Sequence, residues 1–491
     1  MTSTSDHEAD PRPRLLLDRS FWGVNLTQFL GAFNDNLFKQ LVMLLCVDRA
    51  IRGGHDAQGL AMVLFAAPFI AISGFAGFLS DRYSKRTIIV LCKVAEFLIV
   101  LLGLIGFASG NLAVLLAVLC LMGIHSAFFG PSKFGILPEL LPARDLPRAN
   151  GAMLMATFLA IIFGFSAAGL AKQTFEDSLW IASLPCLLIA IMGLGSSLLI
   201  RPTPVAQPHL AFNWSSLALA PETRRTLRQD RKLLGVLVMS SVFWFVGGTV
   251  YPPVINAFGK NQLGLNDLQT GVMAASTGLG IAIGCGLAGV LSRNRVRSWL
   301  VRVGAWGLTL SLAALSIPGP GFNEVRDEIR QTNLLRQQQQ ADKKSGAVAS
   351  NSAASPVITS LRESQADSRE HADSIGQTRS TAPSLFRRGS LLGPFSVVAL
   401  IAVGLFAGFF SVPLQVYLQM AAPSDQKGRI IGAFNLFNWI GIAGSGIVYT
   451  IGRLVLVEWL ALPPATLFGF AALLILPVAV FYRPPETETA T

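Results

Sequence analysis

Residues 77–86 read Gly77-Phe78-Leu79-Ser80-Asp81-Arg82-Tyr83-Ser84-Lys85-Arg86, a short polar stretch between two apolar runs at 58–80 and 87–108. A helix needs about 20 mostly apolar residues to cross a bilayer, and both runs are long enough. The stretch between them carries one acid and three bases, and its small Gly77 allows close approach of a second helix. This pattern predicts a tight turn between two transmembrane helices.

Apolar runs of this length recur along nearly the whole chain. Hydrophobic residues make up 52% of the sequence and charged residues 14%, whereas an average soluble domain has about 25% charged residues. The sequence therefore predicts an all-α integral membrane protein with twelve transmembrane helices. We expect them at 21–47, 58–80, 87–108, 112–130, 147–171, 179–200, 233–257, 268–291, 298–317, 391–418, 430–456 and 464–482.

The distribution of basic residues predicts the orientation in the membrane. If the N-terminus is cytoplasmic, most lysines and arginines fall in cytoplasmic loops, as the positive-inside rule requires, and both termini are cytoplasmic. The net charge of +11 is then explained without nucleic acid. The five cysteines lie inside or at the ends of apolar runs without metal-ligand spacing, so we expect no metal site.

The composition also predicts a division into segments. A cytoplasmic tail is expected at 1–20, an N-terminal six-helix bundle at 21–200, a cytoplasmic linker at 201–232, a C-terminal bundle at 233–482 and a tail at 483–491. The segment 318–390 is rich in Ser, Ala, Gln and charge, and cannot bury enough apolar surface to fold. We expect a disordered insertion on the outer side, with a partner-binding segment as the alternative.

A short internal repeat supports two related halves. The first half contains Ala127-Phe128-Phe129-Gly130, Pro142, Arg148 and Gly151-Ala152, and the second contains Gly408-Phe409-Phe410-Ser411, Pro423, Arg429 and Gly432-Ala433, all at one constant offset. The repeat places spans four and five opposite spans ten and eleven, as a duplication of six helices requires.

The first span carries a polar stripe. At about 100° per residue, six positions fall within one sector of the helix: Asn25, Gln28, Ala32, Asp35, Asn36 and Lys39. Polar groups are costly in hydrocarbon and usually face a bundle interior or water. We expect the stripe to face a central cavity and its polar members to bind substrate or an ion, whereas Asn34 needs a different partner. Hydrogen bonds that only hold the bundle together are the alternative.

Further ionisable residues lie in the third and fourth spans. Lys93 and Glu96 are three residues apart and are expected to pair on one helix face, as a structural pair or as part of a relay. His125 titrates near neutrality in an ordinary environment, or serves as a hydrogen-bonded packing residue. We include Glu96 and His125 among the candidate binding residues.

The stretch 77–86 predicts a gate. Asp81 is placed to face a helix N-terminus or an arginine across the interface between the halves. Arg82, Lys85 and Arg86 are expected to meet anionic lipid head groups. An ordinary basic loop is the alternative.

The second half has an incomplete copy of this gate. The corresponding stretch, 289–297, lacks the acid, so we expect an asymmetric gate. The repeat-related Arg148 and Arg429 complete the candidate gating residues.

The stretch 77–86 resembles the loop signature of the major facilitator superfamily. Several segments are similar to its lysophospholipid transporter branch, which includes the transporter part of bifunctional acyltransferase–transporter proteins. They are 28–39, 128–139, 146–151, 243–245, 412–414, and Gly428-Arg429 with Asn435 and Asn438. The resemblance implies two pseudo-symmetric six-helix bundles, adds Asn435 and Asn438 to the candidate binding residues, and implies flipping of lysophospholipid to the inner leaflet of a bacterial inner membrane. A separate acyltransferase would restore the second acyl chain, since no such domain is expected in this chain.

The sequence thus predicts an alternating-access secondary transporter for lysophospholipid or a related amphiphile, in contact with membrane lipids. No ATP-binding loop and no nucleophile–base pair stands out, so we expect neither a cofactor nor an enzyme. Two alternatives stay open: a proton-coupled exporter of small drugs or metabolites, and a membrane scaffold or sensor that does not transport.

Overall fold

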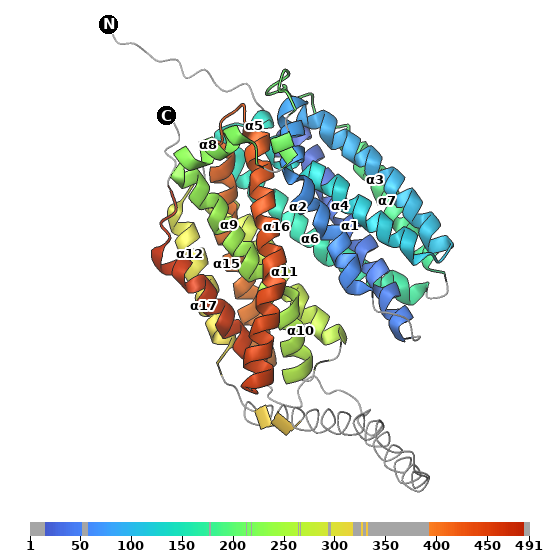
Figure 1. The fold of residues 1–491 in the computed structure, drawn as a ribbon, viewed down its shortest axis with the longest axis vertical. Helices are drawn as coiled ribbons and strands as arrows, with labels where there is room; N and C mark the ends of the chain where they lie inside the picture. Colours follow the sequence, from blue (N-terminus) through green and yellow to red (C-terminus); the bar gives the residue numbers. More distant parts are fainter. Residues whose placement is uncertain are drawn as a thin grey trace, which may run out of the picture.

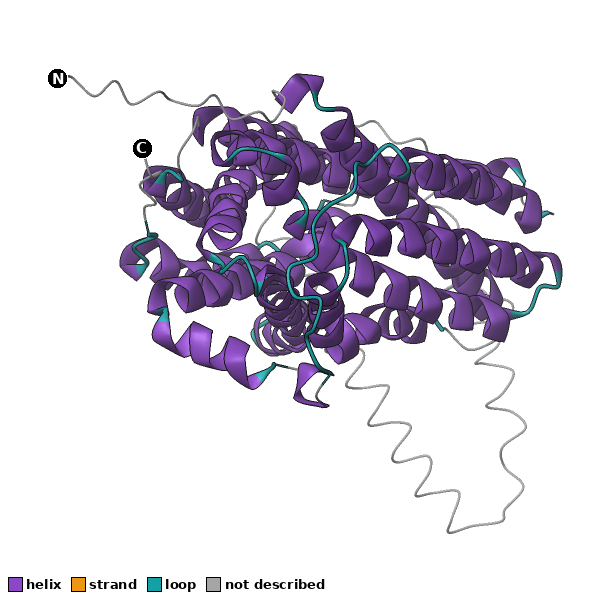
Figure 2. Cartoon of the chain, turned by 90° about the horizontal axis from the view of Figure 1, so that it is seen from above, coloured by secondary structure: helices purple, strands orange, loops and turns teal. Residues whose placement is uncertain are grey.

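The computed structural model describes residues 15–51, 57–175, 178–212, 214–217, 219–263, 265, 267–292, 296–317, 326–327, 330–331 and 392–485. Nearly all of the insertion expected at 318–390, and most of the tails expected at 1–20 and 483–491, lie outside these residues. In the described part, every regular element is a helix (Figure 2).

Twelve long helices form the body of the described chain (Figure 1). The first six are α1 (Arg19–Ile51), α2 (Gln58–Arg82), α3 (Lys85–Ala108), α4 (Leu112–Gly135), α6 (Leu146–Thr174) and α7 (Leu179–Ser197). The others are α9 (Arg231–Thr249), α11 (Asp267–Ser292), α12 (Ser298–Leu315), α15 (Leu392–Ala421), α16 (Lys427–Gly452) and α17 (Thr466–Phe481). Shorter helices include α5 (Leu137–Leu140), α8 (Pro221–Gln229) and α10 (Ile255–Ala257), with 3-10 turns at Leu15–Leu17, Ala143–Asp145 and Trp214–Leu217.

Ten of these helices are long and apolar enough to cross a membrane. The other two are α1, which carries the polar stripe, and α17, which is shorter at 16 residues. Large apolar side chains such as Leu91, Leu188 and Ile447 are exposed on the outside of the helices, as expected for a surface that faces lipid rather than water. The all-α, multi-pass prediction is confirmed.

The predicted seventh span, 233–257, is interrupted. Helix α9 ends at Thr249, and a π-helical turn at Val250–Val254 follows, with Tyr251 outside helical geometry at φ −108° and ψ 123°. The cause is local: Pro252 and Pro253 lack backbone N–H donors, and the residue before a proline is driven out of the helical region. A second π-helical turn, Phe258–Gln262, follows α10.

The long helices form two six-helix bundles. In the first, α1 packs on α6 and α7, and α4 packs on α2 and α3; in the second, α15 packs on α11 and α12, and α16 packs on α9. The bundles meet along two seams, α2 with α16 and α6 with α11. Helices α5 and α8 lie at the top of Figure 1, at what we call the terminal end; the opposite end, near α10, is the loop end.

Glycines allow the backbones to touch at both seams. A Cβ on Gly151 of α6 would lie 2.6 Å from the carbonyl oxygen of Cys285 on α11, and a Cβ on Gly432 of α16 would lie 2.6 Å from the carbonyl oxygen of Ser73 on α2. Gly151 and Gly432 are repeat-related positions. The short sequence repeat therefore corresponds to equivalent packing in the two halves.

The halves approach closely near the terminal end and separate toward the loop end. The glycine contacts lie in the terminal-end parts of the seam helices, and the Phe69 and Trp439 rings stack at 4.1 Å about midway along α2 and α16. Beyond that level, α1, α3 and α7 diverge from α16 and α17 (Figure 1). This conformation is closed at the terminal end.

Candidate functional site

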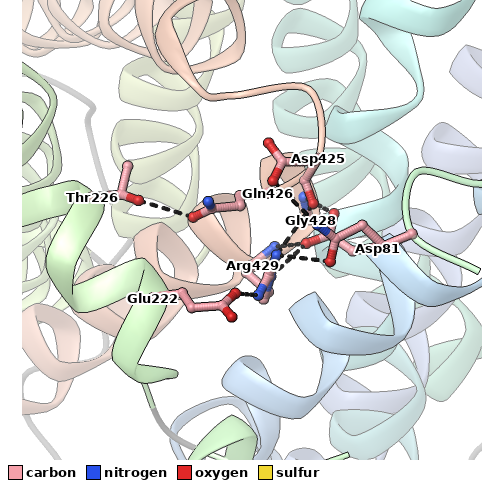
Figure 3. A network of polar contacts seen from close by, with 8 residues as sticks. Asp81, Glu222, Thr226, Asp425, Gln426, Gly428 and Arg429 are labelled. Atoms are coloured by element: carbon pink, nitrogen blue, oxygen red, sulfur yellow. Dashed lines mark hydrogen bonds and ion pairs between the residues drawn. The ribbon is translucent and has the colours of Figure 1, made fainter. Parts of the chain in front are cut away.

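Asp81, the residue before the end of α2, holds the two halves together at the terminal end (Figure 3). Its Oδ1 accepts a hydrogen bond from the backbone N–H of Gly428 at 2.6 Å, and its Oδ2 accepts from the backbone N–H and the Nε–H of Arg429, both at 3.1 Å. Gly428 and Arg429 lie in the first turn of α16, whose unpaired N–H groups and dipole favour an anion. Both kinds of partner expected for Asp81 are therefore present.

The linker between the bundles completes this network. Arg429 donates from Nη1 to Glu222 of α8 at 2.7 Å, and from Nη2 to the side chain of Gln207 at 3.1 Å. A second pair of contacts joins the linker to the residues just before α16. Thr226 donates to Gln426 at 3.0 Å (Figure 3), and Gln207 donates to Asp425 at 3.1 Å. Sequence reasoning missed these linker residues; Glu222 was an acid within an arginine-rich segment, but nothing local indicated its partner.

Two of the basic residues of the stretch 77–86 have partners other than those expected. Lys85 is fully buried and pairs with Glu139 of α5, and Arg86 donates from Nε to the carbonyl oxygen of Ile200 at 2.9 Å. The prediction that Lys85 meets lipid head groups is wrong, because its side chain is buried against Glu139. For Arg86, which is half-buried, contact with lipid stays a prediction. Arg82 is half-buried as well, and its guanidinium lies over the rings of Phe78 and Tyr83.

The gate is asymmetric in the structure. Arg429 is buried within the network, whereas the repeat-related Arg148 lies exposed at the start of α6. The seam beside Arg148 is closed by packing, since Gly289 lies against the backbone of Pro147 and Arg148. The acid that latches the α2–α16 seam thus has no sequence equivalent at the α6–α11 seam.

A buried amide pair adds a further tie between the halves. Asn150 of α6 donates to the Oε1 of Gln419 at 2.7 Å, and Gln419 of α15 donates back to Asn150 at 3.0 Å and to the carbonyl oxygen of Phe134 at 3.1 Å. Sequence reasoning missed this pair as well.

A second polar cluster lies midway along the first bundle, around Glu96 of α3. Its Oε1 accepts from the Nδ2 of Asn34 at 2.9 Å; its Oε2 forms an ion pair with Lys93 and lies 3.6 Å from the Nε2 of His125. The predicted pairing of Lys93 with Glu96 is confirmed, and Asn34 has the separate partner that its position required. All four side chains are buried, so this cluster joins α1, α3 and α4 inside the bundle.

Asp35 lies beside this cluster and is only partly satisfied. Its Oδ2 accepts from the hydroxyl of Ser126 at 2.7 Å. Its Oδ1, like the Nδ1 of His125 and the Oδ1 of Asn25, is buried without a hydrogen-bond partner among the described residues. Buried polar atoms are normally paired. The open atoms of Asp35 on α1 and His125 on α4, beside the same cluster, are therefore what a site for a polar ligand requires, whereas that of Asn25 lies about three turns away along α1.

The rest of the stripe on α1 is divided between neighbouring helices. Gln28 donates to Thr157 of α6 at 3.0 Å, Asn36 donates back to the carbonyl oxygen of Ala32 at 2.7 Å, and Lys39 donates to Asn36 at 3.0 Å. The ammonium group of Lys39 also lies 4.8 Å from the ring centre of Phe65 and 5.4 Å from that of Phe165. The stripe thus combines contacts that hold the bundle with a cation placed between aromatic rings.

The second bundle presents two amides to the first. Asn435 of α16 is half-buried, and its Nδ2 lies 2.7 Å from where a Cβ on Gly130 of α4 would be. Asn438, one turn further along, is buried, and its Oδ1 has no partner in the described part of the chain. Within the same described ranges, no group of three or more His, Cys, Asp and Glu side chains is arranged to hold a metal ion.

Comparison with known proteins identifies the family. A family model of the Major Facilitator Superfamily matches residues 24–324. The chain belongs to the Major Facilitator Superfamily. The predicted fold, two bundles of six helices, is therefore confirmed.

Curated relatives of this major facilitator protein are named Lysophospholipid transporter LplT. That of Serratia proteamaculans (strain 568) is 28% identical over 286 residues, which cover 57% of this chain and 67% of the relative. That of Pectobacterium carotovorum subsp. carotovorum (strain PC1) is 29% identical over 284 residues, covering 56% and 65%. The chain thus matches about two thirds of the length of these relatives, and the predicted resemblance to the lysophospholipid transporter branch is confirmed at this level.

Solved major facilitator structures share the fold. The human organic anion transporter MFSD10 superposes with a TM-score of 0.63 at 15% identity, covering 93% of this chain and 99% of that one. The transporter FucP in the outward conformation gives a TM-score of 0.63 at 14% identity, covering 94% and 97%. At these identities the likeness is one of fold alone.

Proposed function

We propose that this major facilitator protein moves a lysophospholipid, or a closely related amphiphile, across a bacterial inner membrane by alternating access. The observation that carries the proposal is the pairing of a closed gate at the terminal end with a partly unsatisfied polar cluster midway along the bundle. A site closed at one end and placed near mid-depth is what alternating access requires. The relatives named lysophospholipid transporters favour a single-chain phospholipid as the substrate.

The chemistry of the cluster suits a zwitterionic head group. The open Oδ1 of Asp35 would accept hydrogen bonds from an ammonium group, and Lys39, one turn along the same face of α1, would attract the phosphate. The Phe65 and Phe165 rings beside Lys39 offer an apolar surface for the start of an acyl chain. Asn25, Asn36, Asn435 and Asn438 supply further amides around this path.

The charge distribution supports an orientation. The terminal end carries most of the basic residues, so the positive-inside rule favours a cytoplasmic position for it. The closed gate then faces the cytoplasm, and substrate enters from the outer leaflet. In the cell, a separate acyltransferase would re-acylate the delivered lysophospholipid.

The test is inward movement of fluorescent lysophosphatidylethanolamine in proteoliposomes, measured as the fraction protected from extraction by external albumin. We expect protection well above empty liposomes, a loss of at least about tenfold for Asp35→Asn, which removes the charge attracting the ammonium group, and wild-type rates for Asp145→Asn at the terminal end. No movement above empty liposomes contradicts the lipid substrate. Movement only with an imposed proton gradient and a drug-like solute favours the exporter, and absence of any transport favours the scaffold.

A further inference from the structure

A pocket lies beside the hydrogen-bonded contacts of Asp81 and outside the polar cluster, between the terminal end of α2 and the linker. Its volume is about 300 Å³, and it is lined by Phe75, Phe78, Leu79, Arg82, Tyr83, Phe212 and Leu217. Four of these residues recur three and four positions apart, so they share one face of α2. Gly77 and Asp81 lie on a different face, so the pocket is separate from their contacts with α16.

The linker side of the pocket is built from aromatic rings. The ring of Phe212 packs edge-on against Phe75 and Phe78, both at 5.7 Å between centroids, and against Trp214 at 5.8 Å. Backbone contacts hold this part of the linker beside α2, because the N–H of Gln207 donates to the carbonyl oxygen of Asp81 at 2.9 Å. These contacts place the rings of Phe212 and Trp214 beside the terminal end of α2.

These aromatic side chains are unusually exposed for their size. Trp214 is 79% exposed, Tyr83 49% and Phe212 43%. In water such a patch is costly, but Trp and Tyr concentrate where a membrane protein meets the head-group region, since that region solvates both ring and polar tip. The patch therefore indicates contact with the lipid interface.

Arg82 supplies a positive charge within this apolar pocket. Its guanidinium carbon lies 5.9 Å from the ring centre of Phe78 and 5.7 Å from that of Tyr83. It forms no salt bridge with any residue that the structure describes. A cation held by aromatic faces, with its outer side open and apolar walls around it, complements a ligand with an anionic group attached to an apolar chain.

We propose that this pocket binds an anionic phospholipid of the leaflet next to the terminal end, such as phosphatidylglycerol. The lipid phosphate pairs with Arg82, and the upper part of one acyl chain packs on Phe75, Phe78 and Phe212. This lipid is a bound component of the surrounding membrane and is distinct from any transported substrate, so the inference does not depend on the transport proposal.

The experiment measures lipid retained by the purified full-length protein. The protein is incubated with equal amounts of phosphatidylglycerol and phosphatidylcholine in detergent, and the lipids kept through mild activation are counted by native mass spectrometry. We expect at least a threefold preference for phosphatidylglycerol, loss of that preference in Arg82→Gln, and weaker retention in Phe212→Ala. Arg225→Gln, which removes an exposed charge from the neighbouring α8, should behave as wild type.

Three results would overturn the proposal: equal retention of the two lipids by the wild type, an unchanged preference in Arg82→Gln, or displacement of the retained lipid by millimolar inorganic phosphate. The last result would mark a site for a soluble anion. A thermal unfolding midpoint equal to that of the wild type in each variant shows that weaker lipid binding is due to the changed pocket and not to misfolding. The experiment measures no transport, so its outcome is independent of the proposed function.

Discussion

Replacing Asp81 with asparagine should release the terminal end of the molecule. The substitution keeps the shape of the side chain but removes its charge. The single amide oxygen of asparagine can still accept from Gly428. The NH2 group that replaces the second oxygen can only donate, so it cannot pair with the N–H groups of Arg429. Since these hydrogen bonds join α2 to α16 across the seam, they exist only while the terminal end is closed.

The size of the effect follows from the hydrogen bonds and the charge that the substitution removes. Removing one partner of a buried ion pair costs about 3–5 kcal/mol, and a hydrogen bond to a charged group contributes about 1.5–3 kcal/mol. Arg429 keeps Glu222 as a second acid, so the smaller of these two values, that for a hydrogen bond to a charged group, applies. We therefore expect the closed state to be destabilised by about 2–3 kcal/mol. At 1.4 kcal/mol per factor of ten, the ratio of open to closed molecules rises about 30- to 150-fold.

The population shift can be measured by electron paramagnetic resonance distances between two spin labels. Arg144 in the first half and Lys232 in the second are both exposed at the terminal end, and suit labelling once the five native cysteines are replaced. We expect a longer distance to appear in Asp81→Asn. Glu222→Gln serves as the matched control: Glu222 is 68% exposed, so removing its charge should cost at most about 1 kcal/mol. A distance distribution for Asp81→Asn that matches the wild type would refute the latch.

Two further substitutions test the other polar and packing contacts. Glu96→Gln leaves buried Lys93 without its acid and should lower the free energy of unfolding by about 3–5 kcal/mol, which a lower thermal unfolding midpoint in detergent would show. Replacing both residues by methionine should restore much of the lost stability. An unchanged midpoint in the single variant would show that the ion pair contributes nothing. Gly151→Val places a Cβ 2.6 Å from the carbonyl oxygen of Cys285, so the terminal end should stay open in the spin-label distance measurement. Gly195→Val, at a position with no neighbour within 4 Å, should leave the terminal end closed.

Local sequence patterns predicted the features that depend on neighbours in the chain. Apolar run length located the membrane helices, and helical phase separated Asn34 from the stripe and paired Lys93 with Glu96. The partners of Asp81 could be predicted from the polar turn at 77–86, because few groups can donate hydrogen bonds to a carboxylate at a helix end. The pair Pro252-Pro253 indicates the interruption after Thr249, although the predicted span 233–257 did not include a break there.

Contacts between distant segments could not be predicted in the same way. Gln207 and Glu222 reach Arg429 from a linker with no apolar periodicity, so no pattern fixes which of their faces meets the gate. Lys85 looked like an exposed basic residue because the acid that neutralises it, Glu139, belongs to a different helix pair. The partners of Gln28 and Asp35, on α6 and α4, likewise depend on how the helices pack. No local pattern in a single sequence indicates that packing.

The two glycine seams have a consequence for how the molecule opens. Both are closed by backbone contact, but only the α2–α16 seam is also tied by buried charge. Separation should therefore begin along α6 and α11, where packing contacts and the neutral hydrogen bonds between Asn150 and Gln419 must be broken but no buried ion pair, and the halves would swing about an axis near Asp81 before that contact breaks. A duplicated architecture with a single carboxylate at one of its two seams is thus expected to move in an ordered sequence rather than symmetrically.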